Sequence, residues 1–213
     1  MKKIFTYDKY KFNLYDISTS IIYNDDKIKK KILSFMSLDD YNYINSDVTM
    51  YNISVKKYLE LNEFKMNMIP LFDLEPVLNK RLSSLDLPTV IYLKIITSII
   101  NSNEIVIFDD VLSYLSDHYK KIVIGYLKKN KNIFINFTSN IEDVLLVNYL
   151  IVLTNSGVAI EGKTIDVLNE EKILKRLGFN LPFVFDLSLQ LKSYGVIDKS
   201  YTNIDRLVND LWK

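Results

Sequence analysis

Short apolar runs alternate with helical patterns along most of this chain of 213 residues. Continuous runs of Ile, Val and Phe between helices are typical of parallel strands that are buried on both faces. This alternation predicts a layered α/β fold with a mainly parallel sheet. Strands are expected at 21–23, 104–110, 131–139 and 149–157, and helices at 27–36, 88–100, 116–129 and 140–147. Their buried residues should include Ile21, Ile22, Val106, Ile107, Phe134, Ile135, Ile151 and Val152.

The later part of the chain closes the sheet and then becomes helical. The stretch LTNSGVAIEG at 153–162 indicates a hairpin, because its centre consists of the turn-forming residues Asn, Ser and Gly. From about Ile165 the pattern is helical, with breaks at GFNLPF and SYGVID. We therefore expect an α/β core over 1–165, with a helical insertion at about 56–100, and a helical C-terminal extension over 166–213.

Composition excludes several classes of function. The 27 basic and 26 acidic residues balance to a net charge of +1, which argues against nucleic-acid or membrane-surface binding through bulk charge. The chain has no cysteine, so it has no disulfide, thiolate zinc site or thiol nucleophile. The N-terminus lacks the apolar region of a signal peptide, and no apolar run is long enough to span a bilayer. We expect a cytoplasmic protein without direct membrane insertion.

The segment SIIYNDDKIKKKIL at 20–33 has the order strand, turn and helix, a setting in which helix N-termini often bind phosphate. The turn contains no glycine and carries Asp25 and Asp26 where an anion would have to lie. The chain has only 5 glycines, well below the usual ~7%, so backbone amides are poorly suited to cradling phosphate. An alternative is that KIKKK at 27–31 forms a solvated helix face.

Several segments resemble one family. The stretch SSLDLPTVIYLKIITSIINSNEIVIFDDVLSYLSD at 83–117 resembles the segment of ABC ATPases that runs from the signature motif to the D-loop. FINFTSN resembles their strand that ends in Thr-His, and LIVLTNSGVAIEGKTIDVL resembles their closing hairpin. YNYINSDVTMYNISVKKYL resembles the Q-loop region, with Ser46 near the glutamine position. The tail at 173–197 resembles the C-terminal extension of energy-coupling-factor and cobalt-type ATPases, which power vitamin and metal-ion importers.

The resemblance implies a three-layer, P-loop NTPase-like core with a reduced helical subdomain. It places Lys29 at the position of the phosphate-binding lysine and Lys30 at that of the Mg²⁺-binding Ser or Thr. The glycines of the phosphate loop are replaced by Tyr23, Asp26 and Ile28. Without glycine the loop is harder to form, and the aspartates would repel a polyphosphate.

The signature motif is altered in the same way. Its phosphate-binding positions hold Asp86, Leu87, Pro88 and Thr89. Asp86 would face the γ-phosphate with a negative charge, and Pro88 has no N–H to donate. The same residues are a favourable helix start, because Asp caps helices and Pro suits the first turn.

The resemblance also implies roles at the strand ends. Asp109 matches the aspartate that reaches Mg²⁺ through water, so it would be a metal-site residue only if nucleotide binds. Asp110 replaces the glutamate that acts as general base and is one methylene shorter. Ser139 replaces the switch histidine, and Ser116 the D-loop aspartate. An alternative is that the two aspartates cap the next turn.

His118, the single histidine, is expected to be a surface residue. Tyr7 is a candidate for stacking on adenine, although the chain has 15 tyrosines.

The favoured hypothesis is a pseudo-ATPase, a structural or regulatory subunit without efficient ATP binding or hydrolysis and without a resident cofactor. Its expected partners are an ABC ATPase and a transmembrane transporter subunit, at the inner face of the membrane; a homodimer is also consistent, and nucleic acid is not expected. The alternative is a divergent, active ATPase that binds Mg-ATP through Lys29, Asp109 and Asp110. A third hypothesis is a binding module with no connection to transport.

Overall fold

A central sheet organises the computed structural model, which describes residues 2–101 and 105–212. Within these residues the sheet has six strands in the order β4-β5-β6-β3-β7-β8. All neighbouring strands are parallel except β7 and β8, which form the expected hairpin. The bounds are β3 Thr19–Tyr23, β4 Asn42–Ile44, β5 Ile105–Asp109, β6 Ile133–Thr138, β7 Tyr149–Thr154 and β8 Gly157–Lys163. The predicted α/β class with a mainly parallel sheet is confirmed.

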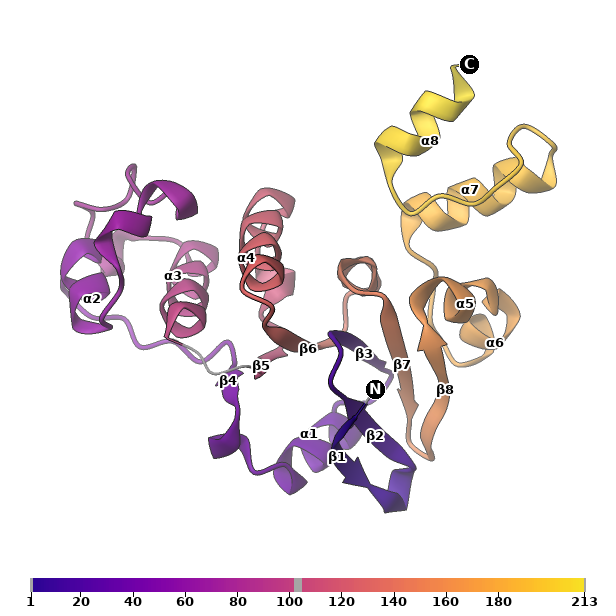
Figure 1. The fold of residues 1–213 in the computed structure, drawn as a ribbon, viewed down its shortest axis with the longest axis horizontal. Coiled ribbons are helices and arrows are strands. Elements are labelled where there is room, and N and C mark those ends of the chain that lie inside the picture. Colours follow the sequence, from indigo (N-terminus) through magenta and orange to yellow (C-terminus); the bar gives the residue numbers. More distant parts are fainter. Residues whose placement is uncertain (1, 102–104, 213) are drawn as a thin grey trace.

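Helices cover both faces of this sheet (Figure 1). One face packs against α1 Asp26–Phe35 and against the small two-stranded sheet of β1 Lys3–Tyr7 and β2 Phe12–Tyr15. The other face packs against α3 Leu87–Ile100 and α4 Asp117–Lys129. Successive strand residues alternate between these two cores because side chains of a strand point to opposite faces. All the core residues predicted from the sequence are buried.

The β1–β2 hairpin was not predicted. Its turn lacks Gly and Pro, and Lys11 takes the left-handed conformation, with φ of 52°. The hairpin is fixed to the sheet at Gly157, where an added Cβ would lie 2.6 Å from the carbonyl oxygen of Tyr10. Tyr7, considered for adenine stacking, stacks on Phe35 of α1, with ring centroids 4.5 Å apart.

The segment between β4 and β5 is mostly helical, as expected. It holds α2 Val55–Leu61 and the 3₁₀ turns η3 Met66–Met68, η4 Pro70–Phe72 and η5 Leu82–Ser84, followed by α3. Further 3₁₀ turns are η1 Asp8–Tyr10, η2 Leu38–Asp40 and η6 Leu112–Tyr114. His118 is exposed, as expected, and its Nε2 lies 2.7 Å from Asp73 Oδ2.

Some element bounds predicted from the sequence were wrong. The segment at 140–147, expected to be a helix, contains one that is shorter and of the 3₁₀ type, η7 Ile141–Leu146. Its Asn140 cap and the early return of the chain into β7 leave room for only one or two turns. The third expected strand was too long at both ends, since β6 covers Ile133–Thr138. Glu104, at the start of another expected strand, lies outside the described residues.

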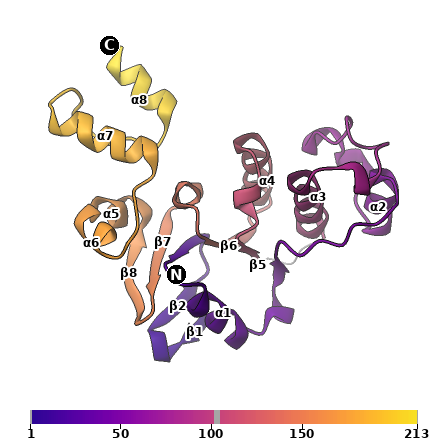
Figure 2. The ribbon, with the colours of Figure 1, turned by 180° about the vertical axis from the view of Figure 1, so that it is seen from behind.

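Helices follow β8: α5 Thr164–Asn169, α6 Glu171–Arg176, α7 Phe183–Ser193 and α8 Ile204–Leu211. The breaks between α6 and α7 and between α7 and α8 contain the two predicted interruptions, except that Phe183 and Ser193 are the first and last residues of α7. Seen from behind, α7 and α8 project from the end of the molecule beyond β7 and β8 (Figure 2). In the part of the chain that the structure describes, no helix is long and apolar enough to cross a bilayer.

Candidate functional site

Several elements end at the same edge of the sheet. Because β3, β5 and β6 are parallel neighbours, their carboxyl ends lie together, and α1 starts just after β3. This edge brings Lys29 of α1 next to Asp109 and Asp110 at the end of β5, and next to Ser139 after β6. We call these four residues, with Tyr23 and Tyr43, the Lys29 cluster.

Lys29 is the centre of the cluster. Its buried Nζ lies 2.7 Å from Asp109 Oδ1, 3.3 Å from Asp110 Oδ2 and 3.4 Å from Asp26 Oδ1. Burial lowers the pKa of Lys29, but hydrogen bonds with Asp109 and Tyr23 and the nearby negative charge raise it more, so the net pKa lies above its ordinary value. Lys29 is therefore a charged ammonium whose partners are supplied by the protein.

Asp110 connects the two neighbouring strand ends. Its backbone lies in the left-handed region, with φ of 57°, and its N–H donates to the carbonyl of Phe137 at 2.9 Å. Its Oδ1 accepts hydrogen bonds from the N–H and Oγ of Ser139, at 2.7 and 3.1 Å. Its Oδ2 accepts from Tyr23 and Lys29. The alternative that the aspartate side chains cap the next turn is wrong, because η6 has no side-chain cap.

Two tyrosines complete the cluster and were not predicted as site residues. The hydroxyl of Tyr43 donates to Asp109 Oδ2 at 2.5 Å, and that of Tyr23 donates to Asp110. Burial, followed by these hydrogen bonds, raises the pKa of both tyrosines above the ordinary range. These contacts depend on the positions of β4, directly beside β5, and of β3, on the far side of β6, and no local sequence pattern signals them.

The turn between β3 and α1 is too short to surround a phosphate group. It consists of Asn24 and Asp25, since β3 ends at Tyr23 and α1 begins at Asp26. The carboxylate of Asp25 caps α1 by accepting the N–H of Lys27 at 2.8 Å. A phosphate loop instead presents several free N–H groups to the anion. The residues present at this turn therefore do not fit the phosphates of Mg-ATP.

An open cleft of about 580 Å³ borders the cluster. Its walls include Lys29, Asp109 and Asp110, together with Ser46 and Asp47 from the segment after β4. The exposed Lys30 also lines this cleft. The alternative of a solvated KIKKK face therefore holds for Lys27, Lys30 and Lys31 but is wrong for Lys29, which is buried.

Asp86, the signature-position residue, lies elsewhere. It is the N-cap of α3, where its Oδ1 accepts the N–H of Thr89 at 3.1 Å. The hydrogen bond with Thr89 lowers the pKa of this carboxyl. Ser116, at the D-loop position, caps α4 in the same way. Both residues therefore serve as helix starts.

A second lysine–carboxylate group, also not predicted, lies on the opposite face of the sheet. Lys120 Nζ of α4 lies 2.6 Å from Asp143 Oδ1 of η7, and both residues are buried. Thr138 donates to Asp143 Oδ2 at 3.1 Å, and Ser20 donates to the Asp143 carbonyl at 3.3 Å. This pair joins α4 and η7 to β3 and β6. We call it the Lys120–Asp143 pair.

Comparison with known proteins finds sequence similarity to transporter ATP-binding proteins. No family model matches the chain. The ATP-binding protein EcfA1 of an energy-coupling factor transporter from Mesomycoplasma hyopneumoniae is 29% identical over 114 residues, which cover 52% of this chain and 40% of that protein. The corresponding EcfA of Malacoplasma penetrans is 26% identical over 145 residues, covering 66% and 50%. The chain thus spans about half or less of the curated relatives it matches.

Solved structures show the same fold. CbiO1 of Clostridium perfringens, part of the ABC transporter complex cbiONQ, superposes with a TM-score of 0.61 at 14% identity, covering 83% of this chain and 90% of that one. A nucleotide-free ATP-binding cassette from an ABC transporter superposes with a TM-score of 0.57 at 12% identity, covering 79% and 90%. This chain is a homologue of the ATP-binding subunits of energy-coupling factor transporters. Its fold is that of an ABC ATPase domain.

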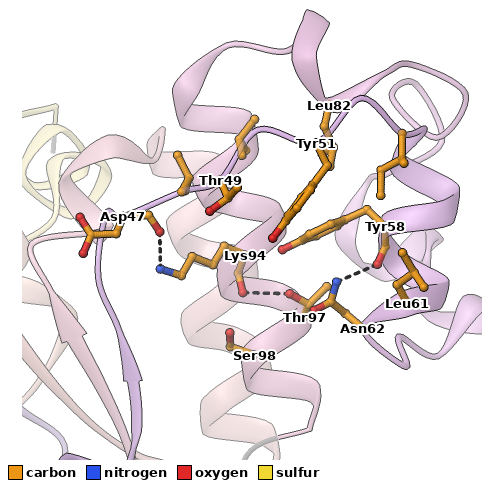
Figure 3. A pocket seen from close by; sticks show the side chains of 13 residues that line it. Asp47, Thr49, Tyr51, Tyr58, Leu61, Asn62, Leu82, Lys94, Thr97 and Ser98 are labelled. Carbon is orange, nitrogen blue, oxygen red and sulfur yellow. Dashed lines mark hydrogen bonds between the residues drawn. The ribbon is translucent and has the colours of Figure 1, made fainter.

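This ECF-ATPase homologue has a second cleft, between α2, α3 and the segment after β4 (Figure 3). The cleft measures about 590 Å³, and the rings of Tyr51 and Tyr58 point into it beside Lys94. Lys94 Nζ donates to the carbonyls of Asn45 and Asp47, at 2.8 and 2.7 Å, and so ties that segment to α3. Burial lowers the pKa of Lys94.

Among the residues that the structure describes, no group of three or more His, Cys, Asp or Glu side chains is placed to hold a metal ion. Asp109, expected at a Mg²⁺ site only if nucleotide binds, accepts from Tyr43 and pairs with Lys29.

Proposed function

We propose that this ECF-ATPase homologue is a pseudo-ATPase, a structural or regulatory subunit that neither binds nor hydrolyses ATP efficiently. The observation that carries the proposal is the ion pair between Lys29 and Asp109, at 2.7 Å. The lysine that would hold phosphate has its charge satisfied by protein carboxylates. A nucleotide would have to separate this pair and leave a partly buried carboxylate without its cation, which is costly.

Charge at the cluster supports the same conclusion. Asp26, Asp109 and Asp110 surround the single ammonium of Lys29, and Asp25 occupies the N-terminus of α1. Negative side chains at that position stabilise the helix and compete with any incoming anion. The catalytic positions Asp110 and Ser139 are hydrogen-bonded to each other, so Asp110 is held as a structural carboxylate.

We further propose that the chain acts beside a partner ABC ATPase and a transmembrane transporter subunit, at the cytoplasmic face of the membrane. The names of the relatives describe transporter ATP-binding proteins, which supports this assignment. The cleft in Figure 3 supplies a surface for such a contact, because Tyr51 and Leu61 on its rim are 51% and 63% exposed. Copurification with a membrane subunit is expected; its absence would favour a binding module unrelated to transport.

One observation favours the alternative of a divergent, active ATPase. Lys29, Asp109, Asp110 and Ser139 lie together at the sheet edge where ABC ATPases carry out hydrolysis. In this alternative the Lys29 cluster would open to admit Mg-ATP, with Lys29 on phosphate and Asp109 toward the metal. Lys30, on the wall of the adjoining cleft, would be a second phosphate contact.

Calorimetric titration with Mg-ATP separates the two functions. The pseudo-ATPase proposal predicts no saturable heat at millimolar nucleotide for the wild type, for Lys29→Ala or for the matched control Lys30→Ala. Saturable binding that is lost in Lys29→Ala alone would overturn the proposal and establish the active ATPase in its place.

A further inference from the structure

A groove lies at the opposite edge of the sheet from the Lys29 cluster, where the parallel strands begin. Its residues come from the segment before β3, from the last turn of α4, from the start of β7 and from the end of β8. Two adjoining cavities of about 560 and 360 Å³ share Val147, Asn148 and Lys163. Both volumes lie in the range of small-molecule sites. Thr202, from the segment between α7 and α8, also lines the smaller cavity.

The charged groups of this groove are both cationic. Lys128 of α4 and Lys163 of β8, both exposed residues, line the larger cavity, and neither forms an ion pair with any residue that the structure describes. No carboxylate is among the described residues that line either cavity. Glu161, two residues before Lys163, is not among them, and burial raises the pKa of its carboxyl. Two unpaired ammonium groups in one cavity favour an anion.

The carbonyl groups of Val147 and Asn148, which line both cavities, each accept a hydrogen bond. Thr164 donates its N–H to the carbonyl of Asn148 at 2.9 Å and its Oγ1 to that of Val147 at 3.0 Å. Ser18 Oγ accepts the N–H of Phe134 at 3.2 Å, which leaves its own O–H to donate. The groove thus offers donors to an anion and presents few free acceptors that would repel it.

The remaining walls are apolar. Ile17 and Tyr149 line the larger cavity and Leu145 and Ile165 the smaller one, so an anionic end held by the lysines would have an apolar surface beside it. Lysine is a compact point charge that suits phosphate. We infer that this groove binds a phosphate monoester carried on a small apolar or aromatic body, with Lys128 and Lys163 on the phosphate.

The inference is tested by calorimetric titration of the full chain with phenyl phosphate, beside inorganic phosphate and phenol. Saturable binding of phenyl phosphate, tighter than either fragment, is expected. Loss of one charged contact in Lys128→Gln or Lys163→Gln should weaken binding by about tenfold or more. Lys163→Arg, which keeps the positive charge, should retain most of the phenyl phosphate binding. Lys121→Gln, which removes the same charge from an exposed position on α4, should bind within about twofold of the wild type.

The result that would overturn the inference is equal binding in Lys163→Gln and Lys121→Gln, or no binding of any phosphate probe. Flotation with phosphatidylcholine vesicles, with and without phosphatidic acid, separates the two sources of a phosphate monoester. Flotation that requires phosphatidic acid and Lys163, without phenyl phosphate binding, assigns the groove to a lipid headgroup. Binding of phenyl phosphate without flotation assigns it to a soluble ester. The groove lies at the opposite edge of the sheet from the Lys29 cluster and shares no lining residue with it, so the outcome does not depend on the proposed function.

Discussion

The Lys29 cluster and the Lys120–Asp143 pair use the same chemistry on opposite faces of one sheet. In each, a lysine on a helix forms an ion pair with a carboxylate near the carboxyl ends of β5 and β6. The Lys120 and Asp143 side chains are 10% and 1% exposed, while those of Lys29 and Asp109 are 8% and 15% exposed and border a cleft. The Lys120–Asp143 pair is buried and borders none of the clefts described above. The Lys29 cluster borders a cleft, and under the proposed function it is structural as well.

Removing Asp143 should have the largest effect on stability. Asp143→Ala leaves Lys120 buried without a counter-ion, which should lower the free energy of unfolding by about 3–5 kcal/mol. Urea unfolding followed by circular dichroism measures the loss. The double variant Lys120→Met with Asp143→Leu should lose less than Asp143→Ala, because no charge is left buried. A greater loss in the double variant would contradict this assignment.

Lys29→Met measures how much the Lys29 cluster contributes to stability, for comparison with the Lys120–Asp143 pair. It leaves Asp109 and Asp110 without their cation but closer to water, so the expected loss is about 2 kcal/mol. Lys30→Met, one residue further along α1 and exposed, is the matched control and should change stability by about 0.5 kcal/mol or less. If both variants unfold at the same urea concentration, Lys29 does not stabilise the fold.

Tyr43→Phe removes a hydrogen bond to the Asp109 carboxylate and should cost about 1.5 kcal/mol at neutral pH. Because the pKa of Tyr43 is raised in the folded state, its contribution is complete below the unfolded pKa of about 10 and is lost as pH rises above that value. The difference in free energy of unfolding between the wild type and Tyr43→Phe should therefore be constant from pH 7 to 9 and decrease above pH 10. A difference that stays the same above pH 10 would count against the hydrogen bond.

The smallest effect is expected at the start of α1. Asp25→Ala removes the cap on the N–H of Lys27 and should lower stability by about 1 kcal/mol. Asp25→Asn keeps a capping oxygen and should lose only a few tenths. Thermal unfolding of the two variants side by side measures the difference, and equal midpoints would show that the cap contributes little.

The sequence was informative wherever a signal is local. The apolar runs located β3, β5, β6 and β7 because buried strands require continuous apolar residues, and Asp86 was recognisable as a cap. Parallel strands also place their ends together, which brought Lys29 to Asp109. Contacts set by register over long separations could not be predicted, namely those of Tyr23, Tyr43 and the Lys120–Asp143 pair. The β1–β2 hairpin was missed because its turn has no glycine or proline.

Unfolding of the wild type and of Lys29→Met, with and without millimolar Mg-ATP, tests the central claim most directly. A ligand present at 100 times its dissociation constant would stabilise the folded state by about 2.7 kcal/mol. The account predicts that Mg-ATP shifts the unfolding midpoint of neither protein, because the Lys29 charge is held by Asp109 and Asp110. A shift in the wild type that disappears in Lys29→Met would contradict it and show that the cluster still binds nucleotide.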